Sequence, residues 1–372
     1  MDNGYITKKF YSKISRLHLP LISLIFIVCC YGLCVLYAIA GENIHPWAYK
    51  QFLNIIFCAP IAIFVAFLDL KTIYQFAWVI YLAVLVMLVV VELLGYTAMG
   101  ATRWLNLGFI KIQPSEPAKL AIIIALARCF SNIEHRNVNR FIYLSLLACI
   151  VIIPTALVIK QPDLGTGIII LVISSCVFFA AGVGIWKFIT LGGSIILLSP
   201  IIWNFLRDYQ KKRIMVFLNP EMDPKGAGYN IIQSKIAIGS GGFWGKGLGE
   251  GTQSQLSFLP EYETDFIFAA LAEDFGFLGC MLLIAIYALI IYISTTVAIN
   301  AKSVFGKLLA LGVTAMFTSH VFINMGMVMG LLPAVGVPLP FISYGGTMIG
   351  TMLVGFGIIL NVHINQSIDI KR

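Results

Sequence analysis

A run of acidic residues leads into one of the long apolar segments of this sequence. In LPEYETDFIF, residues 259–268, Pro260 is followed by Glu261, Glu263 and Asp265, and three apolar residues come directly after Asp265. The dipole of a helix favours an ionised carboxyl group in its first turn, whereas apolar neighbours raise the pKa of that group. Asp265 is therefore a candidate general base, which removes a proton from a hydroxyl group. The simpler interpretation is an acidic residue that begins a helix, which is common.

Basic residues in two other segments have the chemistry to hold an anion. Lys211, Lys212 and Arg213 are consecutive in a long polar segment, and Arg103 lies in TRWLNLGF, residues 102–109. Ammonium and guanidinium groups bind phosphate oxygens through charge-assisted hydrogen bonds. We predict that these four residues bind the phosphate groups of a lipid at a membrane surface.

Two motifs carry charged residues where the surrounding sequence is apolar. QPSEPAK, residues 113–119, ends in Lys119, and KQPDLGTG, residues 160–167, contains Asp163. A charge inside a membrane protein needs a partner, because an unpaired buried charge is strongly destabilising. We therefore predict a structural ion pair between Lys119 and Asp163; the simpler interpretation of Asp163 is a cap on the helix that follows it.

A proline-rich segment near the C-terminus cannot be a regular helix. GLLPAVGVPLPFISYGG, residues 330–346, has three prolines within eight residues. Irregular backbone at membrane depth is tolerated only where it is buried in protein or lines a cavity. We predict that this segment lines a cavity and that Ser343 contacts the ligand there.

The composition identifies the elements that must position these residues. The chain has 372 residues, of which 59% are apolar and 11% charged, and its mean hydropathy is +0.92. A soluble chain of this composition would expose large apolar patches and aggregate. A soluble enzyme, a disordered chain and a small disulfide-rich domain are thereby excluded. The sequence predicts an all-α polytopic membrane protein.

Ten apolar stretches have the length of transmembrane helices. They are residues 19–40, 52–69, 73–95, 117–130, 142–159, 164–183, 186–205, 265–294, 306–330 and 344–362. Ten spans place both termini on one side, where the connecting segments carry 13 Lys and Arg residues against 5 in the short segments opposite. The positive-inside rule makes both termini cytoplasmic. Residues 206–264, between helices 7 and 8, then form a large extracytoplasmic loop.

The domain organisation is simple. We predict a single membrane domain over residues 1–372, in which the basic residues 1–18 form a cytoplasmic interfacial segment. The net charge of +8 is mostly the positive-inside bias, so it predicts no nucleic-acid partner.

Four blocks of the sequence resemble the SEDS proteins, the family of shape, elongation, division and sporulation. The blocks are TRW…QPSEPAK, KQPDLGTG, FLNPEMDPKGAGYNIIQSKIAIGSGG…GTQSQLSFLPEYETDFIFA and GLLPAVGVPLPFISYGG. They occur in the family's order and cover nearly all ten spans. The block from the long loop is the most specific, and it is similar to the members that maintain rod shape rather than to the division members.

The resemblance implies a peptidoglycan glycosyltransferase that polymerises lipid II into glycan strands at the outer face of the bacterial cytoplasmic membrane during elongation. It implies that Asp265 is the essential residue and that Lys119 and Asp163 form a buried pair. An α-linked donor and a β-1,4 product imply one inverting displacement, in which Asp265 accepts the proton of the attacking 4-hydroxyl.

The positions that flank Asp265 match the family only in part. Glu261 belongs to the matched LPE and is expected to contact the substrate. Tyr262 and Glu263 stand where the family usually has Arg-His, so no family role is transferred to them.

The resemblance also implies partners. These are lipid II, a class B penicillin-binding protein with transpeptidase activity, and other membrane proteins of the elongation complex. The sequence shows no dedicated metal-ligand cluster and predicts no metal site, although a divalent cation is compatible with a pyrophosphate-bearing substrate.

Two other functions are compatible with the sequence. A flippase for lipid-linked precursors fits the proline breaks and the intramembrane acids Glu92, Glu273 and Asp274. A non-catalytic scaffold of the elongation complex predicts that Asp265 is dispensable.

Overall fold

The computed structural model of the chain describes residues 13, 15–98, 101–106, 108, 111–223, 226–255 and 261–368. Most of the interfacial segment predicted over residues 1–18 lies outside these ranges. Among the described residues, seven helices are long and apolar enough to cross a membrane. They are α2 (Leu19–Ile39), α3 (Trp47–Phe67), α4 (Leu70–Leu94), α6 (Phe141–Lys160), α13 (Ile267–Asn300), α14 (Val304–Val328) and α15 (Gly346–Ile364).

The remaining predicted spans are helical as well. α8 (Ile185–Leu197) and α9 (Ser199–Phe205) form a pair bent by 48°, which makes an eighth span if it is counted as one. α7 (Leu164–Ala180) is apolar but has only 17 residues. α5 (Ser115–Asn132) carries the charged residues Glu116, Lys119 and Arg128. The all-α polytopic fold class is thus confirmed.

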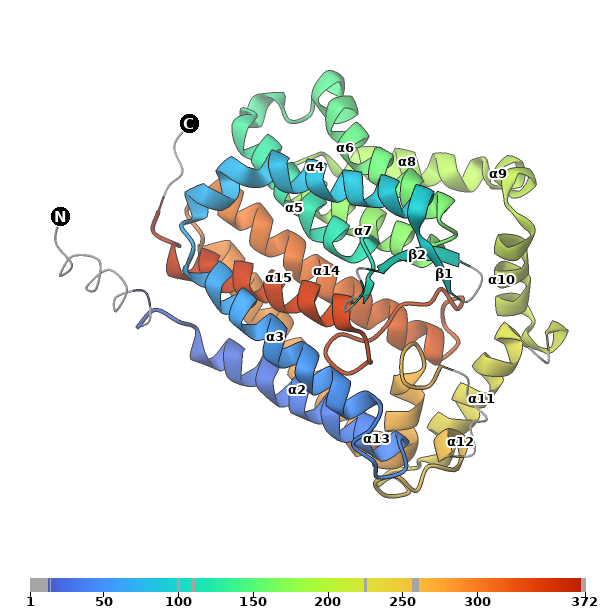
Figure 1. Cartoon of the computed structure of the whole chain (residues 1–372). Helices are drawn as coiled ribbons and strands as arrows, with labels where there is room; N and C mark the ends of the chain where they lie inside the picture. Colours follow the sequence, from blue (N-terminus) through green and yellow to red (C-terminus); the bar gives the residue numbers. More distant parts are fainter. Residues whose placement is uncertain are drawn as a thin grey trace.

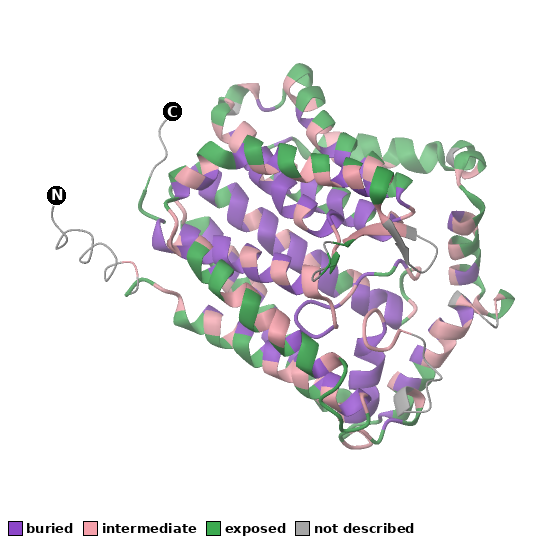
Figure 2. Cartoon of the chain, in the orientation of Figure 1, coloured by how far each residue is buried: buried purple, intermediate pink, exposed green. Residues whose placement is uncertain are grey.

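The helices α5, α14 and α15 form the centre of the bundle, where most side chains are buried (Figure 2). α14 packs on α5, α7, α13 and α15, and α15 packs on α3. Glycine allows the closest of these approaches, since a β-carbon on Gly357 of α15 would lie 2.4 Å from the carbonyl oxygen of Ala62 in α3. By contrast, no described residue of α8 is buried within the chain.

The start of α2 and the end of α15 lie together at one end of the bundle (Figure 1). The rings of His18, before α2, and His363, near the end of α15, are in edge contact with centroids 4.9 Å apart. We call this the terminal end. The opposite end carries Asp265, and we call it the Asp265 end.

A small antiparallel sheet lies at the Asp265 end, between α4 and α5. Its strands are β1 (Tyr96–Ala98), β2 (Ala101–Asn106) and β3 (Lys111–Ile112), in that order. The sequence predicted only a loop here. Pairing of the strands supplies hydrogen-bond partners for backbone groups of this connection, and it fixes Arg103 on β2.

The predicted loop 206–264 is largely helical. It contains α10 (Asp208–Leu218), the 3₁₀-helix η2 (Pro220–Met222), α11 (Ala227–Ser240) and α12 (Thr252–Gln255). A further 3₁₀-helix, η1 (His135–Asn137), lies between α5 and α6. α11 packs against α13 and α14, so this part of the segment lies on the bundle (Figure 1), whereas α10 packs on η2 and α11.

α13 is broken where a glycine-rich loop crosses it. Gly276 has φ +64°, which interrupts the helix. The backbone amides of Lys246 and Gly247 donate to the carbonyls of Glu273 and Asp274 at 3.0 and 3.1 Å. The loop thereby satisfies carbonyls near the break.

Candidate active site

The turn of residues 261–266, directly before α13, carries Asp265. Three consecutive carbonyls of this turn accept hydrogen bonds from α14 and from the segment between α14 and α15. The donors are Asn324 Nδ2 to Asp265 (2.8 Å), Ser343 Oγ to Thr264 (2.5 Å) and Tyr344 N to Glu263 (2.9 Å). The irregular proline-rich segment therefore holds the turn in place, and no helix is found between Val328 and Gly346.

The carboxyl group of Asp265 is half-buried among charged groups of both signs. Its pKa is raised from 3.8 to about 7, first because of burial and then because of the nearby acids Glu261 and Asp163. Arg103 and Arg213 act in the opposite direction and lower this pKa. A carboxyl group with a pKa near neutral pH can both accept a proton and release it again, as a general base must.

Glu261 shares a side-chain hydrogen bond with Asp265. Burial and the neighbouring Glu263 raise the pKa of Glu261. Its backbone has φ +55°, a conformation that a residue with a side chain seldom adopts, and its carbonyl accepts from the amides of Thr264 and Phe266. The turn thus holds two carboxyl groups side by side, which favours one shared proton.

Arg103 reaches this site from β2. Its guanidinium donates to the carbonyls of Gln161 (3.3 Å) and Pro162, and its Nη1 lies 3.7 Å from Asp163 Oδ1. Asp163 is 2% exposed and also accepts from Gln113 Nε2 at 3.2 Å. The sheet and the start of α7 are therefore joined beside Asp265.

Of the three consecutive basic residues 211–213, Arg213 lies near the carboxyl groups of Asp265 and Asp163. Its Nη1 is buried and has no hydrogen-bond partner among the described residues, and its charge acts on Asp265 and Asp163. Lys212 instead pairs with Asp223 at 3.1 Å, and its side chain is 64% exposed. Consecutive residues of a helix point in different directions, so Lys212 is turned away from the acids that Arg213 approaches. Binding of phosphate by Lys211 and Lys212 stays a prediction.

Ser343 is buried and its hydroxyl is used within the protein. It donates to the carbonyl of Thr264 and accepts from the amide of Leu339 at 2.7 Å. The hydroxyl fastens the proline-rich segment to the turn of Asp265, and the substrate contact of Ser343 stays a prediction.

The predicted pair of Lys119 and Asp163 is wrong. Lys119 lies 2.7 Å from Glu116, one turn earlier on α5, and 2.8 Å from Nε2 of His320. Asp163 faces Arg103 and accepts from the amide of Thr166 at the start of α7. The spacing of three residues in the sequence was the signal for the Glu116 pair.

Two of the three intramembrane acids that favoured a transporter form ion pairs, whereas Asp274 forms none among the described residues. Glu273 accepts from Lys246 Nζ at 2.6 Å and from Thr252 Oγ1 at 3.1 Å, and Glu92 pairs with Lys160. Paired acids of this kind hold segments together, so Glu273 and Glu92 no longer support an ion-coupled flippase and only Asp274, which accepts from the amide of Gly249 at 3.3 Å, still does.

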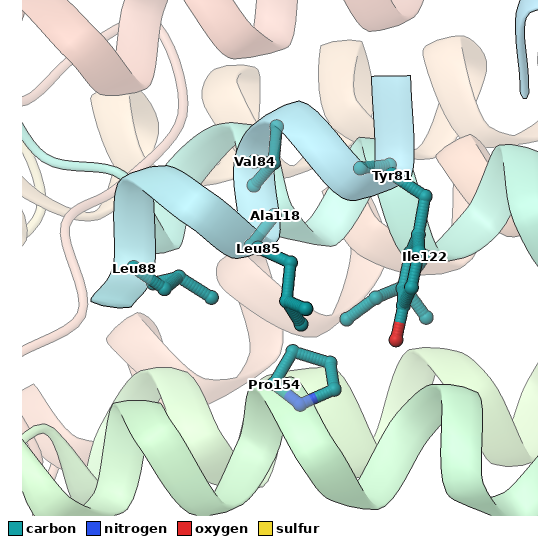
Figure 3. Close-up of a pocket in the computed structure, with 8 residues that line it drawn as sticks. Tyr81, Val84, Leu85, Leu88, Ala118, Ile122 and Pro154 are labelled. Carbon is teal, nitrogen blue, oxygen red and sulfur yellow. The ribbon is translucent and has the colours of Figure 1, made fainter. Parts of the chain in front are cut away.

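A separate pocket between α4, α5 and α6 is apolar (Figure 3). It is lined by Tyr81, Val84, Leu85, Leu88, Ala118, Ala121, Ile122 and Pro154. The hydroxyl of Tyr81 donates to the carbonyl of Ile150 at 3.1 Å. The walls therefore offer no charge for a phosphate-bearing ligand, which leaves the charged site around Asp265 as the candidate. Within the described ranges, no three His, Cys, Asp or Glu side chains are grouped to hold a metal ion.

Residues 13–368 match the family model described as "Cell cycle protein", FtsW/RodA/SpoVE. The chain belongs to this family. The match covers nearly the whole sequence and confirms the family that the four sequence blocks predicted.

The relatives of this chain include proteins that are named peptidoglycan glycosyltransferases. This chain is 44% identical to "Peptidoglycan glycosyltransferase MrdB" of Escherichia coli K12 over 297 residues, 77% of each chain. It is 34% identical to "Probable peptidoglycan glycosyltransferase FtsW" of Trichlorobacter lovleyi, over 94% of each chain. The higher identity to MrdB agrees with the predicted resemblance to the rod-shape members.

Solved structures share the fold. One, from work on "Structural coordination of polymerization and crosslinking by a peptidoglycan synthase complex", has a TM-score of 0.83 at 26% identity and covers 94% of this chain and 98% of its own. The rod shape determining protein RodA of Thermus thermophilus has a TM-score of 0.72 at 25% identity, over 95% of this chain and 98% of its own. The chain is thus a multi-pass membrane protein of this fold.

Proposed function

We propose that this family member is a peptidoglycan glycosyltransferase that polymerises lipid II during cell elongation and rod-shape maintenance. The class of enzyme is supported by the names of its relatives. The observation that carries the proposal is the carboxyl group of Asp265, which has a pKa of about 7 and lies beside Arg103 and Arg213.

The reaction joins two lipid-linked sugars. The 4-hydroxyl of the acceptor attacks the anomeric carbon of the donor, the bond to the polyprenyl pyrophosphate breaks, and an α-linkage becomes a β-1,4 bond. Asp265 accepts the proton of the hydroxyl as the new bond forms, which keeps the nucleophile from carrying a positive charge. Glu261, hydrogen-bonded to Asp265, is placed to share that proton afterwards.

Arg103 and Arg213 can stabilise the pyrophosphate leaving group. As the bond to the pyrophosphate breaks, negative charge grows on its oxygens, and fixed guanidinium groups stabilise that charge. Arg213 has a buried nitrogen with no protein partner among the described residues. Arg103 is held by carbonyls of Gln161 and Pro162, so it is already oriented before substrate arrives.

The orientation in the membrane follows from charge and geometry. The start of α2 and the end of α15 lie at the end opposite Asp265 (Figure 1), and the excess of Lys and Arg lies on this side. We infer that the termini are cytoplasmic and that Asp265 faces outward, within one membrane domain that spans residues 1–372. Lipid II in the outer leaflet would then reach the site from the membrane.

A transpeptidase partner is part of the proposal. One structural relative comes from a peptidoglycan synthase complex that coordinates polymerization and crosslinking. We infer that this chain pairs with a class B penicillin-binding protein and assembles with other membrane proteins of elongation.

The direct test is glycan synthesis from labelled lipid II by the purified chain, with and without a class B penicillin-binding protein. We expect long glycan strands, and more of them with the partner. A folded chain that makes no strands with either preparation, yet moves lipid II between the leaflets of vesicles, would show a flippase instead.

A further inference from the structure

Asn324 joins the turn of Asp265 to the irregular segment that follows α14. Its side chain is fully buried in α14. The amide nitrogen Nδ2 donates twice, to the carbonyl of Asp265 at 2.8 Å and to the carbonyl of Val337 at 2.7 Å. One side chain therefore ties together two parts of the site that are far apart in the sequence.

The other half of this amide makes no bond. Oδ1 of Asn324 is buried and has no hydrogen-bond partner among the described residues. An unpaired polar atom inside an apolar helix is costly, and leucine would fill the same space without that cost. The presence of asparagine is therefore explained by the two carbonyls that its nitrogen holds.

His320, one turn earlier on α14, holds the neighbouring carbonyl. Its Nδ1 lies 3.4 Å from the carbonyl oxygen of Pro338, and its Nε2 lies 2.8 Å from Lys119 Nζ. The Lys119 ammonium can only donate, so Nε2 accepts and the ring proton on Nδ1 faces Pro338. α14 thus fixes the part of the proline-rich segment that lies beside Asp265. A β-carbon on Gly336 of this segment would be 3.3 Å from the Asp265 carboxylate.

We propose that Asn324 is a positioning residue of the catalytic site and acts through Asp265. Holding the carbonyl of Asp265 fixes the direction of its side chain, and the bond to Val337 fixes the surface against which the carboxylate rests. A general base works only when it is aligned with the proton that it accepts. This inference rests on the proposed function, in which Asp265 is that base.

The test compares two buried amides of the same kind. Asn361 of α15 is also fully buried. Its Nδ2 donates to the carbonyls of Val65 (2.9 Å), Ala66 (3.3 Å) and Leu68 (2.5 Å), and its Oδ1 accepts from Asn365 Nδ2 (3.3 Å). It lies near the terminal end, far along α15 from the site. Asn324→Leu and Asn361→Leu therefore each remove a buried amide that holds backbone carbonyls, and only Asn324 holds the carbonyl of Asp265.

The measurement is kcat and KM for lipid II polymerisation per folded molecule, together with the melting temperature of each variant. We expect both variants to melt lower, and Asn324→Leu alone to lose about 10- to 100-fold in kcat with KM unchanged. Asn324→Ser, which is smaller and keeps one donor, replaces the leucine variant if that does not fold. Parental kcat in the folded Asn324 variant, an equal loss in both variants, or a change in KM alone would overturn the proposal. The parent is assayed first, and its inactivity would count against the proposed function rather than against Asn324.

Discussion

Gly336 lies directly against the carboxylate of Asp265: a β-carbon on Gly336 would be 3.3 Å from Asp265 Oδ2. Its φ of +72° is also a conformation that favours glycine. We expect Gly336→Ala to push the carboxylate aside by a few tenths of an ångström and to lower kcat by roughly tenfold or more. Steady-state polymerisation of lipid II measures this loss.

Gly242 provides the control for backbone strain. It has φ +58°, but a β-carbon there would meet nothing within 4 Å. Gly242→Ala should cost about 1 kcal/mol in stability, as alanine does at positive φ, and should leave kcat per folded molecule unchanged. Equal losses of kcat in the two variants would mean that strain alone is responsible.

The pH dependence of the reaction should follow Asp265. The base must be ionised, so kcat/KM should rise with pH and level off above the pKa of about 7. Arg213→Gln removes a cation that lowers this pKa, so the rise should move to higher pH. Glu261→Gln removes an acid that raises it, so the rise should move to lower pH.

Lys212→Gln is the matched control for Arg213, because Lys212 is adjacent on α10 but exposed and paired with Asp223. Its pH profile should coincide with that of the parent. A profile of Arg213→Gln that also coincides with the parent would contradict the role of this arginine.

The ion pair on α5 can be tested by double-mutant cycles. Lys119→Met should destabilise the protein by about 3–5 kcal/mol, because it leaves the Glu116 carboxylate buried without its cation. Adding Glu116→Gln should recover part of this loss, so the coupling energy of this pair should exceed about 1 kcal/mol. The effects of Lys119→Met and Asp163→Asn on the free energy of unfolding should instead add within about 0.5 kcal/mol. Thermal unfolding in detergent measures all of these variants. Coupling to Asp163 but not to Glu116 would restore the pair expected from the sequence.

Glu273 is completely buried and depends on Lys246 for its charge partner. Lys246→Met should therefore lower the melting temperature substantially, and Glu273→Gln in the same chain should restore most of it. The absence of such a rescue would show that the two residues contribute independently.

The sequence predicts the helices well because each carries its own signal. An apolar stretch such as 73–95 needs no distant partner to be a helix in a membrane. The strands β1 to β3 have between two and six residues, so their pairing depends on where α4 and α5 end rather than on local pattern.

Partners of side chains were harder to predict than their burial. Lys119 and Asp163 are both buried, as expected. Lys119 pairs with Glu116 on its own helix, whereas Asp163 faces Arg103 on the neighbouring sheet. Lys212 and Arg213 look alike in sequence, and only the direction in which α10 turns them separates the exposed lysine from the half-buried arginine. The roles of Ser343 and Asn324 depend on a fold that brings residues 324–344 onto the turn of Asp265.

The measurement that tests the central claim most directly is lipid II polymerisation by purified Asp265→Asn, a variant that keeps the shape of the side chain but cannot accept the proton. It should fold and bind its transpeptidase partner like the parent. The rate of strand synthesis should fall by about 10²–10⁴-fold. Glu263→Gln, in the same turn, should keep most of the activity. Near-normal turnover by folded Asp265→Asn would contradict the account, because the carboxylate could then not be the base.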